Sequence, residues 1–245
     1  EDSMIYRPAR RGVNVAGRWF ILQHVAWEGP GLIASEAQAR GLPTEVRRMD
    51  RGEAVPPVED LAGLVVMGGP MGVRDAASYP FLTGELDLLR AAVNGGLPVL
   101  GVCLGSQLLA AALGARVDKG PMPEIGPGEV SLTADGLNDP VLGGAGATLP
   151  VVHWHEDTFE LPAGATHPAR SSLYPNQAFR VGDRAYALQF HVEVDRTLAA
   201  AWAARLPPGV LLDEDRRALI ETTGRRIINR FFDAAGDAAS PDRWA

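Results

Sequence analysis

The most reactive side chain in this sequence belongs to its single cysteine, Cys103, within the run Gly101-Val-Cys-Leu-Gly105. Glycines on both sides of a cysteine permit the tight turn of a nucleophile elbow, which raises the nucleophile above the end of a sheet. If a helix begins there, its dipole and free N–H groups favour the thiolate. The N–H of Leu104 would then face the oxyanion formed by attack on a carbonyl. Cys103 could equally be an inert buried thiol in a glycine-rich turn.

A thiol nucleophile needs a base, and the base usually needs an orienting group. The segment Tyr186–Glu193 offers His191 and Glu193, which are two residues apart and would share one face at the end of a strand. Glu193 could hold one imidazole nitrogen while the other faces Cys103. The alternative is a surface His-x-Glu pair with no catalytic role.

A second pair of histidines, His153 and His155, also has strand spacing and could suggest a metal site. No third ligand lies close by in the sequence, so we expect neither a metal site nor a cofactor. The glycine-rich turns 68–70 and 143–146 lack the Lys-Ser/Thr ending of a phosphate-binding loop.

Composition excludes several classes of protein. The chain has 245 residues, with 23 Lys+Arg against 30 Asp+Glu and a net charge of −7. A phosphate-backbone binder needs a concentrated basic face, so a nucleic-acid partner is not expected. No apolar run approaches the roughly 18 residues of a membrane span. One cysteine cannot form an intramolecular disulfide and no secretory signal is visible, so a cytoplasmic location is expected.

The elements that would position these residues alternate between strand and helix in the first half of the chain. Apolar strand runs are predicted at 19–25, 44–49, 64–67 and 98–102, and helices at 31–40, 80–93 and 104–113. This alternation predicts a doubly wound, mostly parallel α/β sheet flanked by helices. Short strands are predicted at 129–133, 148–152, 169–172, 178–181 and 185–190, as antiparallel additions in the second half. An amphipathic helix is predicted at 213–232.

We expect a single domain from residue 19 to residue 245. Residues 1–18 carry four arginines and little apolar periodicity, and we interpret them as an N-terminal arm. No internal repeat or low-complexity linker divides the remainder.

Three motifs in order resemble those of the class I (triad) glutamine amidotransferases, and in particular the stand-alone, GMP-synthase-like members. The motifs are Met67-Gly-Gly-Pro70, Gly101-Val-Cys-Leu-Gly-Ser-Gln107 and Gln189-Phe-His-Val-Glu193. Further similar stretches are 67–73, 153–164 and 173–179, so the resemblance extends from about residue 19 to residue 195. Each motif alone is weak to moderate, but their joint occurrence in this order is specific.

The resemblance implies a mechanism that agrees with the residues. Cys103 would attack the side-chain amide of glutamine, His191 would transfer the proton, and Glu193 would orient His191. The family implies an oxyanion hole from the backbone N–H groups of Gly69 and Leu104. Without that resemblance, Gly69 is simply a turn glycine before a proline.

The family also implies which residues hold the substrate. Gln107 lies one helical turn after Cys103 and matches a substrate-contacting position, although it could be a solvated helix residue. Backbone around Met71 and from Trp154 to Asp157 would hold the amino-acid end of glutamine. Two positions depart from the family pattern: Val192 stands where proline is common, and Glu156 stands where glycine is usual.

The Glu156 carboxylate could alter the substrate preference, or it could simply face solvent. We therefore keep three functions: a glutamine amidotransferase or glutaminase, a γ-glutamyl hydrolase acting on another amide or peptide, and a non-catalytic binding module. Retention of Cys103, His191 and Glu193 argues against the third. An ammonia-accepting synthetase partner is possible under the first, because 245 residues leave no room for a second catalytic domain.

Overall fold

The computed structural model describes residues 17–144, 146–210 and 212–236. The predicted N-terminal arm therefore lies outside the described residues, except for its last two positions. Of these, Arg18 already begins the first strand, one residue earlier than expected.

The helices and strands follow one another in an α/β pattern over the first half and a largely β pattern thereafter. In chain order the elements are β1 (Arg18–Gln23), α1 (Gly31–Ala39), β2 (Thr44–Arg48), η1 (Met49–Arg51), η2 (Val58–Asp60), β3 (Leu61–Val66), η3 (Asp75–Ala77), α2 (Phe81–Asn94), β4 (Val99–Val102), α3 (Leu104–Ala112), β5 (Val117–Leu132), α4 (Ala134–Leu137), β6 (Thr148–Phe159), β7 (Thr166–Arg170), β8 (Ala178–Val181), β9 (Ala185–Leu188), α5 (Arg196–Ala203) and α6 (Glu214–Gly236).

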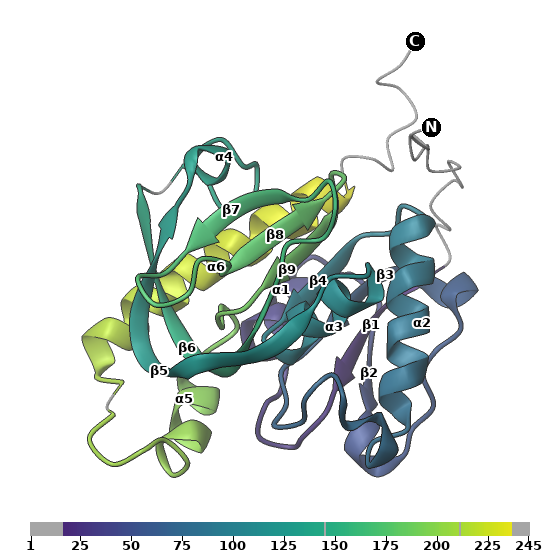
Figure 1. The fold of residues 1–245 in the computed structure, drawn as a ribbon, viewed down its shortest axis with the longest axis horizontal. Helices are drawn as coiled ribbons and strands as arrows, with labels where there is room; N and C mark the ends of the chain where they lie inside the picture. The colour runs from purple at the N-terminus through teal and green to yellow at the C-terminus, as the bar shows by residue number, and fades with distance from the viewer. Residues whose placement is uncertain (1–16, 145, 211, 237–245) are drawn as a thin grey trace.

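Within the described residues, nine strands form one sheet in the order β2-β1-β3-β4-β9-β8-β7-β5-β6 (Figure 1). The pairs from β2 to β9 are parallel, and the pairs from β9 to β6 are antiparallel. This confirms the predicted class, a parallel α/β sheet with antiparallel additions in the second half. The additions continue the same sheet, so β9 is the strand at which the pairing changes direction.

Helices cover both faces of the parallel strands because successive residues of each strand point to opposite faces. In β3, Val65 joins the core on one face, whereas Leu64 and Val66 join the core on the other. The first core lies under α1 and α6, and the second lies under α2 and α3. Strands with apolar residues on both faces are typical of buried parallel sheets.

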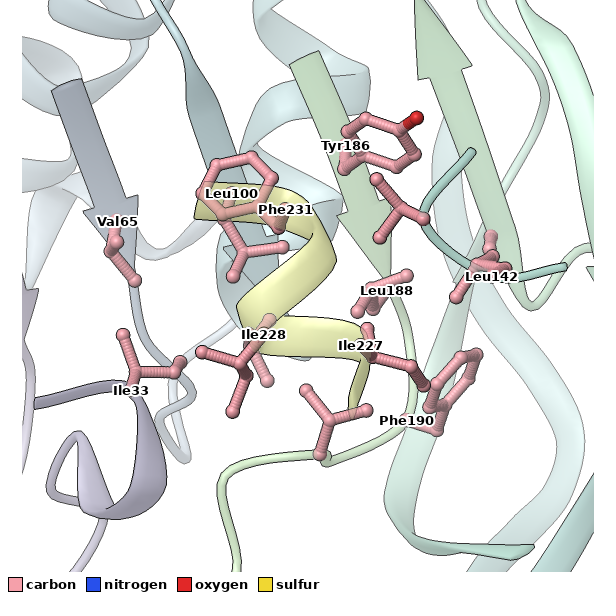
Figure 2. Packing of buried hydrophobic residues seen from close by; sticks show 14 of the residues in the cluster. Ile33, Val65, Leu100, Leu142, Tyr186, Leu188, Phe190, Ile227, Ile228 and Phe231 are labelled. Carbon is pink, nitrogen blue, oxygen red and sulfur yellow. The ribbon is translucent and has the colours of Figure 1, made fainter. Parts of the chain in front are cut away.

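The C-terminal helix α6 supplies much of the first core. Ile227, Ile228 and Phe231 point from α6 toward Leu100 of β4 and its neighbours (Figure 2). These α6 side chains are fully buried or nearly so. The predicted apolar face of residues 213–232 therefore packs against the chain's own sheet. The sequence spacing also assigns Leu219 to this apolar face, and that assignment was wrong, since the Leu219 side chain is exposed.

The hairpin of β5 and β6 is much longer than the predicted strands 129–133 and 148–152. The missed part of β5 includes the glycine- and proline-rich segment 120–128, which reads as a series of turns in the sequence. It remains in the sheet because β5 pairs with β6 on one side, while its pairing with β7 is limited to Ser131 and Leu132. Prolines on the unpaired edge need no ladder hydrogen bond, and a register shift after Lys119 absorbs the irregularity.

Helix α5 was not predicted. Its start is marked by Asp195, whose carboxylate oxygen accepts a hydrogen bond of 2.8 Å from the backbone N–H of Leu198. An aspartate three residues before a leucine is an N-cap signal that the sequence already carried. Among the described helices, none combines the length and the apolarity that a membrane span needs.

Candidate active site

Cys103 lies in a sharp turn between β4 and α3, as the sequence predicts. Its backbone has φ 52° and ψ −109°, and it is the only described residue other than glycine with a positive φ. Both flanking positions must be glycine because the backbone packs too closely there for a side chain. A Cβ on Gly105 would lie 2.0 Å from the Val66 carbonyl oxygen, and one on Gly101 would lie 2.4 Å from the Gly105 carbonyl oxygen. A strained residue at such a turn is the signature of a nucleophile elbow.

His191 and Glu193 form a tight buried pair beside this turn. The Nδ1 atom of His191 lies 2.7 Å from Glu193 Oε1, and both side chains are almost completely buried. The other carboxylate oxygen, Oε2, accepts a hydrogen bond of 2.9 Å from the backbone N–H of Val192. The carboxylate is thus held from two sides, which fixes the plane of the imidazole.

The second ring nitrogen of His191, Nε2, is buried, and apart from the Cys103 sulfur no group in the described part of the chain is placed to hydrogen-bond with it. Burial alone would lower the pKa of His191, but the charges of Glu193 and Cys103 outweigh burial and raise this pKa well above its ordinary value. This favours an imidazolium at neutral pH. The geometry thus brings Cys103 together with His191 and Glu193, although 88 positions of sequence separate Cys103 from His191.

One part of the sequence interpretation was wrong: His191 and Glu193 do not extend a strand. Strand β9 ends at Leu188, where its pairing with β8 ends. The chain then leaves β8 and forms an isolated bridge in which the N–H of His191 donates to the Val152 carbonyl oxygen over 2.8 Å. The long strand β6 therefore supports the backbone of His191.

Aromatic side chains cover the other side of His191. The ring of Trp202, from α5, packs edge-on against the imidazole with a centroid distance of 4.8 Å. Its indole N–H donates to the Trp27 carbonyl oxygen over 2.8 Å, and Trp154 packs against both tryptophans. Trp202 is buried, so the imidazole is shielded from solvent on this side.

A small cavity of about 220 Å³ is lined in part by Trp154, whose carbonyl oxygen contacts Cys103, although Cys103 is not itself among the lining residues. Its wall comes from the loop after β3, from α3 and from β6, and consists of Gly69, Pro70, Met71, Gly72, Gln107, Trp154, His155, Glu156 and Asp157. The cysteine Sγ lies 3.5 Å from the Trp154 carbonyl oxygen, at this wall. All five residues predicted to hold substrate line the cavity.

The predicted oxyanion residues are neighbours. A Cβ on Gly69 would lie 3.1 Å from the Cδ2 atom of Leu104, so the loop after β3 touches the first turn of α3. Gln107 is buried rather than solvated, and its amide donates to Gln189 Oε1 over 3.2 Å and to the Asp157 carbonyl oxygen over 3.4 Å. Gln107 therefore links α3 to the cavity wall on β6.

Glu156 has a partner that the sequence did not reveal. Its carboxylate pairs with Lys119 across the β5–β6 hairpin at 3.2 Å, with 37% of the Glu156 side chain exposed. The negative charge at the rim of the cavity is therefore partly compensated, and part of the side chain faces solvent.

Comparison with known proteins shows the family to which the chain belongs. The family model for class-I glutamine amidotransferases matches residues 31–202. The chain belongs to the class-I glutamine amidotransferases. YfeJ of Salmonella typhimurium, a glutamine amidotransferase-like protein, is 34% identical over 209 residues, and the match covers 84% of each chain.

Two further proteins show which parts of other amidotransferases this one matches. A glutamine amido transferase from Methylobacillus flagellatus has a TM-score of 0.80 and 29% identity over 90% of this chain and 96% of that one. The glutamine-hydrolysing GMP synthase of Aeropyrum pernix is 36% identical over 147 residues, covering 60% of this chain but only 26% of the synthase.

The sequence interpretation missed a further carboxyl group in the site of this amidotransferase. Glu28 follows β1 and is buried; a Cβ on Gly68 would lie 2.2 Å from its Oε2 and 3.2 Å from the Cε1 atom of His191. Burial raises the pKa of Glu28 to about 7, the charge of His191 opposes this rise, and Glu193 adds to it. The sequence could have indicated Glu28 as a site residue, because it follows a parallel strand and sites form at the carboxyl ends of such strands.

A second missed group holds the loop that carries Gly69. The Nδ1 atom of His24 lies 2.9 Å from the Gly68 carbonyl oxygen, and its Nε2 lies 3.0 Å from Glu85 on α2. Both side chains are completely buried. Burial would lower the pKa of His24, but the contact with Glu85 raises it overall. The pair connects α2 to the loop and fixes its position above α3.

The strained backbone at Cys103 makes a prediction about stability. We expect Cys103→Gly to be more stable than Cys103→Ala by about 1–2 kcal/mol, because only glycine adopts this φ and ψ without strain. The measurement is urea unfolding of the two variants. As a control, Ala111→Gly within α3 should lower the free energy of unfolding by about 1 kcal/mol, because alanine is more stable than glycine at an ordinary helical position. A Cys103→Gly variant less stable than Cys103→Ala would contradict the strain.

The buried carboxyl of Glu28 predicts a pH-dependent effect of Glu28→Gln. The pKa is higher in the folded state, so the protonated carboxyl contributes stability that is complete below pH 4.5 and is lost as pH rises through about 7. Glutamine does not ionise, so the variant should gain about 2.5 kcal/mol relative to the wild type between pH 5 and pH 8.5. Thermal and urea unfolding at both pH values test this gain. Asp183→Asn, at a fully exposed side chain, should show none; an equal gain in both variants would refute the assignment.

Proposed function

We propose that this amidotransferase releases ammonia from the side-chain amide of glutamine through a γ-glutamyl thioester on Cys103. The observation that carries the proposal is the convergence of Cys103, His191 and Glu193 beside a cavity lined by the predicted substrate residues. The raised pKa of His191 supports an imidazolium paired with a thiolate, which is the reactive form of such a dyad.

In the proposed reaction the thiolate attacks the amide carbon and forms a tetrahedral intermediate. The imidazolium of His191 gives its proton to the departing nitrogen, so ammonia leaves and a thioester remains. The neutral imidazole then takes a proton from water, which attacks the thioester carbonyl and releases glutamate. Glu193 stays ionised throughout and holds the ring by its 2.7 Å contact with Nδ1.

The backbone N–H groups of Gly69 and Leu104 are proposed to stabilise the oxyanion. Support comes from the contact between these two residues and from the beginning of α3 at Leu104, where N–H groups lack helical acceptors. Gln107, Met71 and the backbone of Trp154–Asp157 would then hold the amino-acid end of the substrate, since all of them line the cavity.

The use of the released ammonia is a separate part of the proposal. Most of the A. pernix GMP synthase has no counterpart in this chain, because the match covers 26% of it. We therefore propose that a synthetase partner accepts the ammonia, or that the enzyme acts as a glutaminase. The cytoplasmic location stays a prediction.

Glu156 favours a second candidate, hydrolysis of another γ-glutamyl amide or peptide. Its carboxylate lies at the rim of the cavity with only the exposed Lys119 as its ion-pair partner, so a substrate with a cationic extension could bind there. The third candidate, a non-catalytic module, is disfavoured because the chain retains Cys103, His191 and Glu193.

We expect Cys103→Ala to lower ammonia and glutamate release from glutamine by at least about a thousandfold, because the thioester can no longer form. The assay compares glutamine with γ-glutamyl amides, each with the wild type, with Cys103→Ala and with Leu219→Ala, a change at an exposed position of α6. Leu219→Ala should retain full activity. If Cys103→Ala turns over substrate at the wild-type rate, the assignment of Cys103 as the nucleophile is wrong. If the wild type hydrolyses γ-glutamyl amides but not glutamine, the second candidate is favoured.

A further inference from the structure

Two histidines and a glutamate converge behind the wall of the substrate cavity. His153 and His155 lie on one face of β6, and strand pairing places Glu124 of β5 directly opposite His155. The Oε2 atom of Glu124 is 3.1 Å from Nε2 of His155 and 3.4 Å from Nδ1 of His153. In the sequence these histidines had no third ligand nearby; the β5–β6 hairpin supplies one from 29 residues upstream of His153.

Hydrogen bonds on the outer side fix which ring nitrogens face inward. The Nδ1 atom of His155 lies 3.0 Å from the Asp157 carbonyl oxygen, which can only accept, so Nδ1 donates this hydrogen bond and Nε2 faces Glu124. The ring of His153 hydrogen-bonds the backbone of Glu129 and leaves Nδ1 buried without a hydrogen bond. Metal-binding histidines are oriented in this way by backbone carbonyls.

Gln177 completes the group from the segment between β7 and β8. Its side chain is fully buried, and Nε2 donates to Glu124 Oε2 over 2.6 Å and lies 3.4 Å from His155 Nε2. The Gln177 amide thus contacts Glu124 and His155 but not His153. Among the described residues it leaves Gln177 Oε1 and His153 Nδ1 buried without a hydrogen bond, which is unfavourable for each atom.

We propose that Glu124, His153 and His155 bind a zinc ion, with the carbonyl oxygen of a reoriented Gln177 as the fourth ligand. The ligand atoms of the first three residues already lie within 4.8 Å of one another. Tetrahedral Zn²⁺ with bonds of about 2.0–2.1 Å sets its ligand atoms about 3.3 Å apart, close to the two contacts of Glu124. Two imidazoles, a carboxylate and an amide oxygen are ligands that zinc accepts.

Such an ion would be structural, because four side chains leave no open position for a substrate or a water. It would join β5 to the stretch of β6 that lines the substrate cavity and contacts Cys103 through the Trp154 carbonyl. The ion would thereby hold one wall of the cavity in place. The site is separate from the reaction proposed above, which needs no metal step.

The test uses the whole chain with Cys103→Ala, since a thiolate beside an imidazole could itself bind zinc. After dialysis against a chelator, the protein is titrated with ZnCl₂ by calorimetry and its zinc content is measured after desalting. We expect one ion per chain with a Kd below about 1 µM. Adding His153→Asn or Glu124→Gln should weaken binding at least about tenfold. His167→Asn, at a histidine outside the cluster, should leave it unchanged.

No bound zinc in Cys103→Ala, or equal affinity with and without His153→Asn, would overturn the site and leave Gln177 as the permanent partner of Glu124 and His155. If the ligand variants do not fold, Co²⁺ substitution in Cys103→Ala decides the question. Intense visible bands of tetrahedral Co²⁺ without a sulfur charge-transfer band support the site, and a weak octahedral spectrum contradicts it.

Discussion

The meeting of the Cys103 sulfur with the His191 imidazole depends on two neighbouring parallel strands that end at the same edge of the sheet. Cys103 follows β4, His191 comes three residues after β9, and β4 pairs with β9 in parallel. Carboxyl ends of adjacent parallel strands are the usual place for sites in α/β sheets. Here β9 is also the strand at which parallel pairing changes to antiparallel pairing, so both halves of the molecule contribute to the site.

Burial of this site has a cost that the surrounding structure must offset. A charged imidazole in the interior needs a nearby counter-charge, which Glu193 provides at 2.7 Å. The positive φ of Cys103 adds strain, and it is maintained by glycine-to-backbone contacts on both sides of the turn. The buried side chains of α6 and the aromatic packing around Trp202 supply the apolar contacts that hold these groups in position.

Much of the fold and the turn that carries Cys103 could be predicted from the sequence because they depend on local patterns. The apolar runs of β3 and β4 and the Gly-x-Cys-x-Gly turn specify their own geometry. The extension of β5 could not be predicted, since residues 120–128 read as turns and join the sheet only through β6. Glu28 and the His24–Glu85 pair were missed for the same reason: the contacts that matter come from segments far away in the chain. The predicted strand 185–190 was two residues too long, since pairing with β8 ends at Leu188 and His191 is held by a tertiary bridge to Val152.

The pairing of Cys103 with His191 is tested most directly by alkylation, because the chain has one cysteine and every thiol signal reports on it. The measurement is the rate of iodoacetamide modification at pH 6, for the wild type and for His191→Asn, with folding checked by circular dichroism. We predict that the asparagine variant reacts at least about tenfold more slowly, because the imidazolium no longer stabilises the thiolate. Equal rates in two folded proteins would contradict the ion pair and, with it, the proposed catalytic centre.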